Sequence, residues 1–258
     1  MGTKESFNSA AELYDRARPS CPEDVVDWIL AKTNPPRDQT ILEIGPGTGQ
    51  TTLPFAVKGY KIHCVELGDN LARMLLANAS NYPVTVDVAT FENWRPENDM
   101  QYPLIFSASA FHWLERNTRY KRCFDLLKND GYLALLWNVT SASDISEVKQ
   151  AYDLLWDYYP EKKVQKSCVT DPYKDREKEI NSSGYFALTD HLEYKWILTQ
   201  NRERFIDGFF TQSSFLSLDE PKRKDLSQKI SKVLFRMEDQ IETEFTTVVY
   251  IAKKKGPD

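Results

Sequence analysis

A glycine-rich stretch at residues 41–51, with the sequence Ile-Leu-Glu-Ile-Gly-Pro-Gly-Thr-Gly-Gln-Thr, is the feature that most constrains how this chain folds. Its apolar residues around one acid predict a short buried parallel strand. Three glycines at alternate positions, Gly45, Gly47 and Gly49, then predict a turn that opens a helix. We therefore expect a nucleotide-like ligand to approach the backbone at this turn, the alternative being a glycine turn that holds no ligand.

The residues around the glycines indicate which kind of ligand fits. The dinucleotide-binding fingerprint places its third glycine three positions after the second, and here that position is Gln50. Glu43 stands at the end of the predicted strand, where its carboxylate would repel a diphosphate. S-adenosylmethionine carries a sulfonium and an ammonium and no phosphate, so its charge suits an acid at this position. The pattern therefore favours S-adenosylmethionine over a dinucleotide.

The Glu-x-Gly-x-Gly-x-Gly pattern resembles motif I of the class I S-adenosylmethionine-dependent methyltransferases. Two other segments carry the same resemblance. Residues 14–22 are similar to the Tyr-Asp-x-x-Arg-Pro-x-Tyr-Pro entry of one methyltransferase group, with Cys21 where a tyrosine is usual. The run Ala-Phe-His-Trp at residues 110–113 is similar to a small-molecule subgroup that includes relatives of trans-aconitate methyltransferase. The specific part of the resemblance spans residues 14–138.

The resemblance implies a single α/β domain with a Rossmann-like, seven-stranded, mostly parallel sheet, its last strand antiparallel, and helices on both faces. Within residues 1–258 we expect an N-terminal helical cap at 1–39 and a cofactor-binding core at 40–140. The sequence Asn34-Pro35-Pro36 is expected to end the last helix of the cap. A helical lid insertion at 141–184 and a C-terminal part of the sheet with helices at 185–258 complete the expected domain.

An acid about 20 positions beyond a glycine motif is placed to accept both ribose hydroxyls of a nucleotide, and Glu66, followed by Leu67, ends the second predicted strand. The resemblance adds further cofactor residues. It implies that Tyr14 contacts the methionine end of the cofactor and that Arg18 approaches its carboxylate, unless the two only attach the N-terminal helix to the domain. It also places Thr90 and Phe91 against the adenine, although Phe91 fits the core equally well.

Ser107 opens the segment where the family places the transferring methyl group. His112 is then either a general base on an acceptor hydroxyl or a residue that only shapes the pocket, because an acceptor carboxylate needs no base. Trp113 either lines the acceptor pocket or fills the core. The segment 107–109 supplies no carboxylate for Mg²⁺, so the sequence predicts a reaction independent of metal.

Composition narrows the partners. The net charge of −5 and the pI near 5.4 predict no general attraction to nucleic acid or to an anionic membrane. No leader and no apolar run of about 18 residues is seen, and the 4 cysteines form no Cys-x-x-Cys pair, so we expect a cytoplasmic protein with reduced thiols. The predicted function is methyl transfer to a small molecule, with non-catalytic cofactor binding or a nicotinamide-dependent oxidoreductase as alternatives.

Overall fold

The structure is a computed structural model that describes residues 4–140, 145–159 and 175–256. Its chain divides into two compact units. A sheet unit contains residues 19–139, 175–194 and 247–258, and a helical unit contains residues 1–18, 140–174 and 195–246. The predicted single domain, with segments 1–39, 40–140, 141–184 and 185–258, stays a prediction. The two units divide the chain at other residues.

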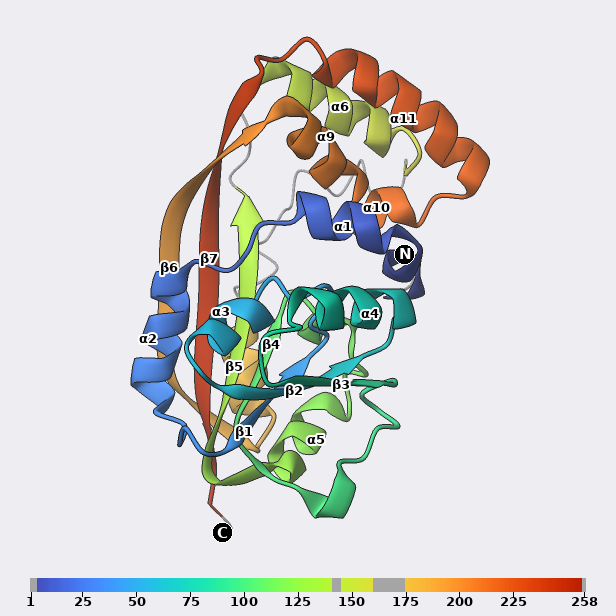
Figure 1. The fold of residues 1–258 in the computed structure, drawn as a ribbon. Coiled ribbons are helices and arrows are strands. Elements are labelled where there is room, and N and C mark those ends of the chain that lie inside the picture. The colour runs from blue at the N-terminus through green and yellow to red at the C-terminus, as the bar shows by residue number, and fades with distance from the viewer. Residues whose placement is uncertain (1–3, 141–144, 160–174, 257–258) are drawn as a thin grey trace. The chain divides into compact units, whose positions relative to one another are not determined.

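The sheet has seven strands in the order β3-β2-β1-β4-β5-β7-β6 (Figure 1). Their bounds are β1 Thr40–Ile44, β2 Lys61–Glu66, β3 Val84–Val88, β4 Tyr102–Ala108, β5 Leu127–Thr140, β6 Phe186–Asn201 and β7 Gln240–Lys254. The strands β1 to β5 pair in parallel, with Glu43 of β1 beside Cys64 of β2 and Phe106 of β4. The chain order reverses next to β1, which is where an open α/β sheet leaves room for a ligand at the carboxyl ends of its strands.

The last two strands run antiparallel to the neighbours they contact. Along β7, Tyr250 lies against Trp137 of β5, while the earlier Thr247 donates a hydrogen bond to the later Asn138. Next to β6 and β7, the Lys255 backbone N–H donates a hydrogen bond to the Tyr185 carbonyl. Four residues after Tyr185, the Thr189 hydroxyl donates to the carbonyl of Ile251, which comes before Lys255 in the chain. The predicted fold class, a mostly parallel seven-stranded sheet that ends in antiparallel strands, is therefore confirmed.

Helices cover both faces of the sheet. The sheet unit contains α2 Glu23–Thr33, α3 Thr52–Val57, α4 Asp69–Asn78, α5 Arg119–Leu126 and α8 Arg176–Ser182, with short 3-10 helices η2 Glu97–Asp99 and η3 Phe111–Trp113. On one face, buried residues of α2, α3 and α4 share a core with alternate strand residues such as Ile41 and Ile62. Elsewhere Tyr120 of α5 packs between Phe111 and Phe186. As expected, α2 ends before the prolines, with Asn34 in a left-handed conformation.

The helical unit is assembled from three separate parts of the chain. It contains η1 Lys4–Ala10, α1 Ala11–Ala17, α6 Ser146–Trp156, α9 Arg202–Phe210, α10 Ser213–Leu216 and α11 Glu220–Leu234. Apolar residues of α6, α9, α10 and α11 form its own core, and Tyr152, Tyr158 and Tyr159 pack against that core. The predicted lid at 141–184 is thus only partly described, and its described helices α6 and α8 fall in different units.

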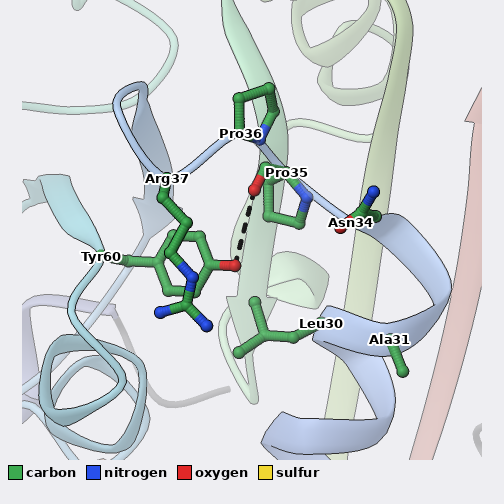
Figure 2. Close-up of a pocket in the computed structure, with 7 residues that line it drawn as sticks. All are labelled: Leu30, Ala31, Asn34, Pro35, Pro36, Arg37 and Tyr60. Carbon is green, nitrogen blue, oxygen red and sulfur yellow. Dashed lines mark hydrogen bonds between the residues drawn. The ribbon is translucent and has the colours of Figure 1, made fainter.

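A surface hollow of about 560 Å³ lies before the amino ends of β1 and β2, lined by the end of α2, the segment 34–37 and Tyr60 (Figure 2). Tyr60 and Pro35 form its buried wall, and the Tyr60 hydroxyl donates a hydrogen bond to the Pro35 carbonyl at 3.5 Å. The Arg37 guanidinium lies over the Tyr60 ring, 4.8 Å from the centroid. None of the predicted site residues lines this hollow.

Candidate functional site

The glycine loop, residues 45–49, connects β1 to α3 at the carboxyl edge of the sheet. Gly45 has a φ of +67°, and a Cβ atom there would lie 2.5 Å from Cβ of Ala110. Gly49 has a φ of +105°, and a Cβ there would lie 2.8 Å from the Leu75 side chain. A side chain is therefore excluded at Gly45 by backbone conformation and by space, and it is disfavoured at Gly49 by backbone conformation. The Gly45 contact also shows that the segment after β4 lies directly against the glycine loop.

Glu66, the predicted ribose ligand, is tied to this loop. It ends β2 and is 6% exposed. Its Oε2 accepts a hydrogen bond from the Gly47 backbone N–H at 3.0 Å, and its Oε1 accepts one from the Gly68 N–H at 2.9 Å. Burial raises the pKa of Glu66. Hydrogen bonds from the backbone amides of Gly68, Gly47 and Leu67 offset part of this rise in the pKa. Each carboxylate oxygen has a second lone pair, so Glu66 can accept further hydrogen bonds.

Glu43 lies beneath the glycine loop with none of its surface exposed. Its Oε2 accepts a hydrogen bond from the Thr52 hydroxyl at 2.6 Å, and its Oε1 has no partner among the described residues. Burial raises the pKa of Glu43 to about 8, the Thr52 hydrogen bond lowers it, and the charge of Glu66 raises it. The predicted role of Glu43, to offset cofactor charge, thus involves a carboxyl group that holds its proton near neutral pH.

Three more predicted cofactor residues lie in the sheet unit close to this edge. The Thr90 hydroxyl oxygen is buried and has no hydrogen-bond partner among the described residues, so it is available to a ligand. Phe91 is 3% exposed and packs under the Arg122 guanidinium at 5.0 Å, which places its ring in the protein interior. The buried Ser107 hydroxyl donates to the Ile44 carbonyl at 2.8 Å and so braces β4 against β1. Of the three, Thr90 alone presents an unsatisfied polar atom.

His112 and Trp113 lie in η3, two and three residues beyond Ala110. The Trp137 indole N–H donates to Nδ1 of His112 at 3.3 Å, although the His112 residue as a whole keeps an exposed surface. Removal of this nitrogen from water and the positive charges of Arg176 and Arg119 lower the pKa of His112 to about 4. The Trp113 ring lies 5.0 Å from the His112 ring. The His112 imidazole is therefore neutral at physiological pH.

A buried ion cluster next to His112 was not predicted from the sequence. Arg119, 3% exposed, donates to the Phe111 carbonyl at 3.1 Å and to the Glu179 carboxylate. Arg176 donates to the other oxygen of Glu179 at 2.5 Å. Two guanidinium groups thus share one carboxylate. No local pattern could have indicated it, because Arg119 and Glu179 are 60 residues apart in sequence.

Tyr14 and Arg18 belong to the helical unit. Arg18 donates to the Thr211 carbonyl at 2.8 Å, and its guanidinium lies 5.3 Å from the centroid of the Tyr14 ring. Both residues therefore have a structural role within the helical unit, as one of the two interpretations expected. Their contact with a cofactor stays a prediction, as does that of Leu67.

The described residues contain no cluster of metal ligands and no helix that could span a membrane. Within residues 4–140, 145–159 and 175–256, no group of three or more His, Cys, Asp or Glu side chains is placed to hold a metal ion. Over the same residues, no helix has the length and apolar character to cross a bilayer. Cys21, Cys64 and Cys123 are buried free thiols, and Cys168 lies outside the described residues.

Comparison with known proteins identifies the segment that carries the glycine loop. A family model described as a methyltransferase domain matches residues 42–135, from β1 through most of β5. Residues 42–135 are therefore similar to a methyltransferase domain. The predicted resemblance to class I methyltransferases is thereby confirmed, while the trans-aconitate subgroup stays a prediction.

Relatives carry the same family description. The uncharacterized methyltransferase Rv3342 of Mycobacterium tuberculosis is 30% identical over 133 residues, which is 52% of this chain and 52% of the relative. The match thus spans about half the length of the first relatives. The uncharacterized methyltransferase C25B8.09 of Schizosaccharomyces pombe is 25% identical over 96% of this chain and 97% of its own.

Solved structures share the fold of the methyltransferase domain and its surroundings. The YcgJ protein of Bacillus subtilis has a TM-score of 0.56 at 14% identity, covering 92% of this chain and 100% of that chain. The [4+2]-cyclase SpnF has a TM-score of 0.56 at 11% identity, covering 91% of this chain and 82% of that chain. Since a cyclase shares it, the fold alone does not fix the reaction, and the site residues must carry the functional argument.

Proposed function

We propose that this chain binds S-adenosylmethionine at the carboxyl edge of the sheet and transfers its methyl group to a small-molecule acceptor. The observation that carries the proposal is Glu66, whose buried carboxylate is fixed by the amides of Gly47 and Gly68 at the rim of the glycine loop. A carboxylate fixed in this way keeps lone pairs for the ribose diol of the cofactor. When bound, S-adenosylmethionine supplies a methyl group already activated by its sulfonium.

Other residues of the edge fit the same cofactor. The unsatisfied Thr90 hydroxyl can accept a hydrogen bond from the adenine amino group, in the place where an aspartate is common in the family. The glycine loop carries no side chain at 45 and 49 that would block the methionine part from the backbone. Ala110 lies against Gly45, which supports η3, with His112 and Trp113, as the acceptor side. The residues orient the two reactants and exclude water.

The proposed partners and cellular location are those expected from the sequence. A small-molecule acceptor, no nucleic acid, no membrane and a cytoplasmic location are part of the proposal, supported by the acidic net charge of −5. Metal independence is proposed on the same basis as before, because residues 107–109 supply no carboxylate.

Isothermal titration calorimetry with S-adenosylhomocysteine tests the proposal. We expect binding by the wild-type chain and none of comparable affinity for NADH. Glu66→Gln replaces one acceptor oxygen by an amide that cannot accept from a backbone N–H, and it should weaken binding by about 1–3 kcal/mol, or roughly 5- to 150-fold. Glu238→Gln, at an exposed position, is the matched control and should bind like wild type.

Three results would count against the proposal. Equal affinity of wild type and Glu66→Gln would remove Glu66 from the site, and binding of NADH in place of S-adenosylhomocysteine would favour an oxidoreductase. Tight binding of S-adenosylhomocysteine without methyl transfer from S-adenosylmethionine to any member of a panel of carboxylic acids, phenols and amines would support a non-catalytic binding protein.

A further inference from the structure

The inference concerns the hydrogen bond between Trp137 and His112. Trp137 lies near the carboxyl end of β5 and is 1% exposed, and its indole N–H faces Nδ1 of His112 at 3.3 Å. An indole N–H can only donate a hydrogen bond, so the imidazole nitrogen that faces it must offer a lone pair. In a neutral imidazole the proton then sits on the other nitrogen, Nε2. The contact therefore selects one of the two tautomers of His112.

The surroundings keep the ring neutral. The Arg176 guanidinium lies over the Trp137 ring, 5.1 Å from its centroid, and the buried Arg119 donates a hydrogen bond to the carbonyl of Phe111, the residue before His112. Glu179 is shared by both arginines and also lies 3.9 Å from the exposed Arg116, so cations outnumber the carboxylate. A proton added to His112 would bring another cation to this cluster, in agreement with its lowered pKa.

The histidine also has a second nitrogen that is not occupied. Among the described residues, Nδ1 is engaged by Trp137, while no hydrogen bond to Nε2 is recorded. His63 shows the contrast, because both of its ring nitrogens are engaged, one by Tyr102 and one by Asp87. Ala110, two residues before His112, lies against Gly45 of the glycine loop.

We propose that Trp137 is a positioning residue that holds His112 in the tautomer protonated at Nε2, so that His112 donates a hydrogen bond to an oxygen of the methyl acceptor. A nitrogen that already carries a proton cannot remove one, so His112 does not act as the base of the reaction through Nε2. The acceptor must then present lone pairs on its own, as a carboxylate or carbonyl oxygen does. This inference rests on the proposed function for its acceptor, but not for the tautomer.

Nuclear magnetic resonance of the full chain labelled with ¹⁵N-histidine tests the inference at neutral pH. The chain has 3 histidines, and His112→Gln identifies the His112 signals by their loss. We expect His112 to show an unprotonated Nδ1 and a protonated Nε2. Trp137→Phe removes the indole N–H and keeps an aromatic ring, so the His112 signals should move toward a mixture of both tautomers. Trp28→Phe, on α2, is the matched control and should leave them unchanged.

A proton on Nδ1 of His112 in the wild-type chain would overturn the inference. So would unchanged His112 signals in a Trp137→Phe variant whose amide spectrum remains that of a folded protein. If Trp137→Phe does not fold, the wild-type tautomer decides alone. These spectra need no cofactor, so a chain that shows the expected tautomer but fails to bind S-adenosylhomocysteine would contradict the proposed function and leave the positioning by Trp137 in place.

Discussion

Replacing Glu43 by glutamine should make the protein more stable at alkaline pH, although it removes an acid from the glycine motif. Glu43 is fully buried, and burial raises its pKa from 4.5 to about 8. The unfolded chain therefore releases this proton at a lower pH than the folded chain does. A raised folded pKa contributes stability that is complete below pH 4.5 and is lost as the pH rises through about 8.

The size of the effect follows from the shift. One pKa unit corresponds to about 1.4 kcal/mol, so the interval from pH 5 to pH 8 represents a loss of up to roughly 4 kcal/mol in wild type. Glu43→Gln is neutral at every pH, and its amide carbonyl can accept the hydrogen bond that the Thr52 hydroxyl now donates to Glu43. The variant should match wild type at pH 5 within about 1 kcal/mol and exceed it at pH 8 and above.

Urea unfolding at intervals from pH 5 to pH 9, followed by tryptophan fluorescence, measures this difference. Glu238→Gln, an exposed control, should follow the pH dependence of wild type. The reasoning fails if the difference between Glu43→Gln and wild type is the same at pH 5 and pH 8. It also fails if the variant becomes less stable than wild type as the pH rises, since that would mean that a charged Glu43 stabilises the fold.

Two further predictions concern the glycine loop and His112. Gly45→Ala should cost at least about 2 kcal/mol in urea unfolding, because of the positive φ and the clash with Ala110. Gly208→Ala, at a helical position with nothing within 4 Å of the added Cβ, should instead gain about 0.5–1 kcal/mol. A glutamine amide at position 112 can donate a hydrogen bond but cannot accept a proton as a base. With the acceptor that gives the highest turnover, the kcat of His112→Gln should therefore be at least about 10-fold higher than that of His112→Phe. Equal losses in these two variants would favour a base.

The local part of the fold could be predicted from the sequence because short patterns encode it. The first two strands are mostly buried runs that end at a glycine turn or at an acid, whereas β3, at the edge of the sheet, is partly exposed. The segment before Tyr132 reads as a turn because of Asn129 and Asp130, yet β5 begins at Leu127, whose carbonyl accepts a hydrogen bond from the Lys254 ammonium at 2.6 Å. Pairing with a distant strand overrides the local turn signal.

In the candidate site, too, the sequence predicts the positions of residues but not the contacts between distant ones. Spacing alone places Glu66 at the end of β2, but the sequence does not show that its two oxygens are held by Gly47 and Gly68. The tautomer of His112 depends on Trp137, 25 residues away, through the register of β5 beside β4. The helical unit depends on contacts such as the Arg16 bond to Asp207 at 2.8 Å, which joins residues 191 apart. Such distant contacts leave no local pattern.

A crystal structure of the chain with S-adenosylhomocysteine tests the central claim most directly, because it shows at once whether the carboxyl edge holds this cofactor. The account predicts the ribose diol on the Glu66 carboxylate, the adenine amino group at the Thr90 hydroxyl and the sulfur beside Gly45 and η3. A ligand bound elsewhere, or a ribose that makes no contact with Glu66, would contradict it.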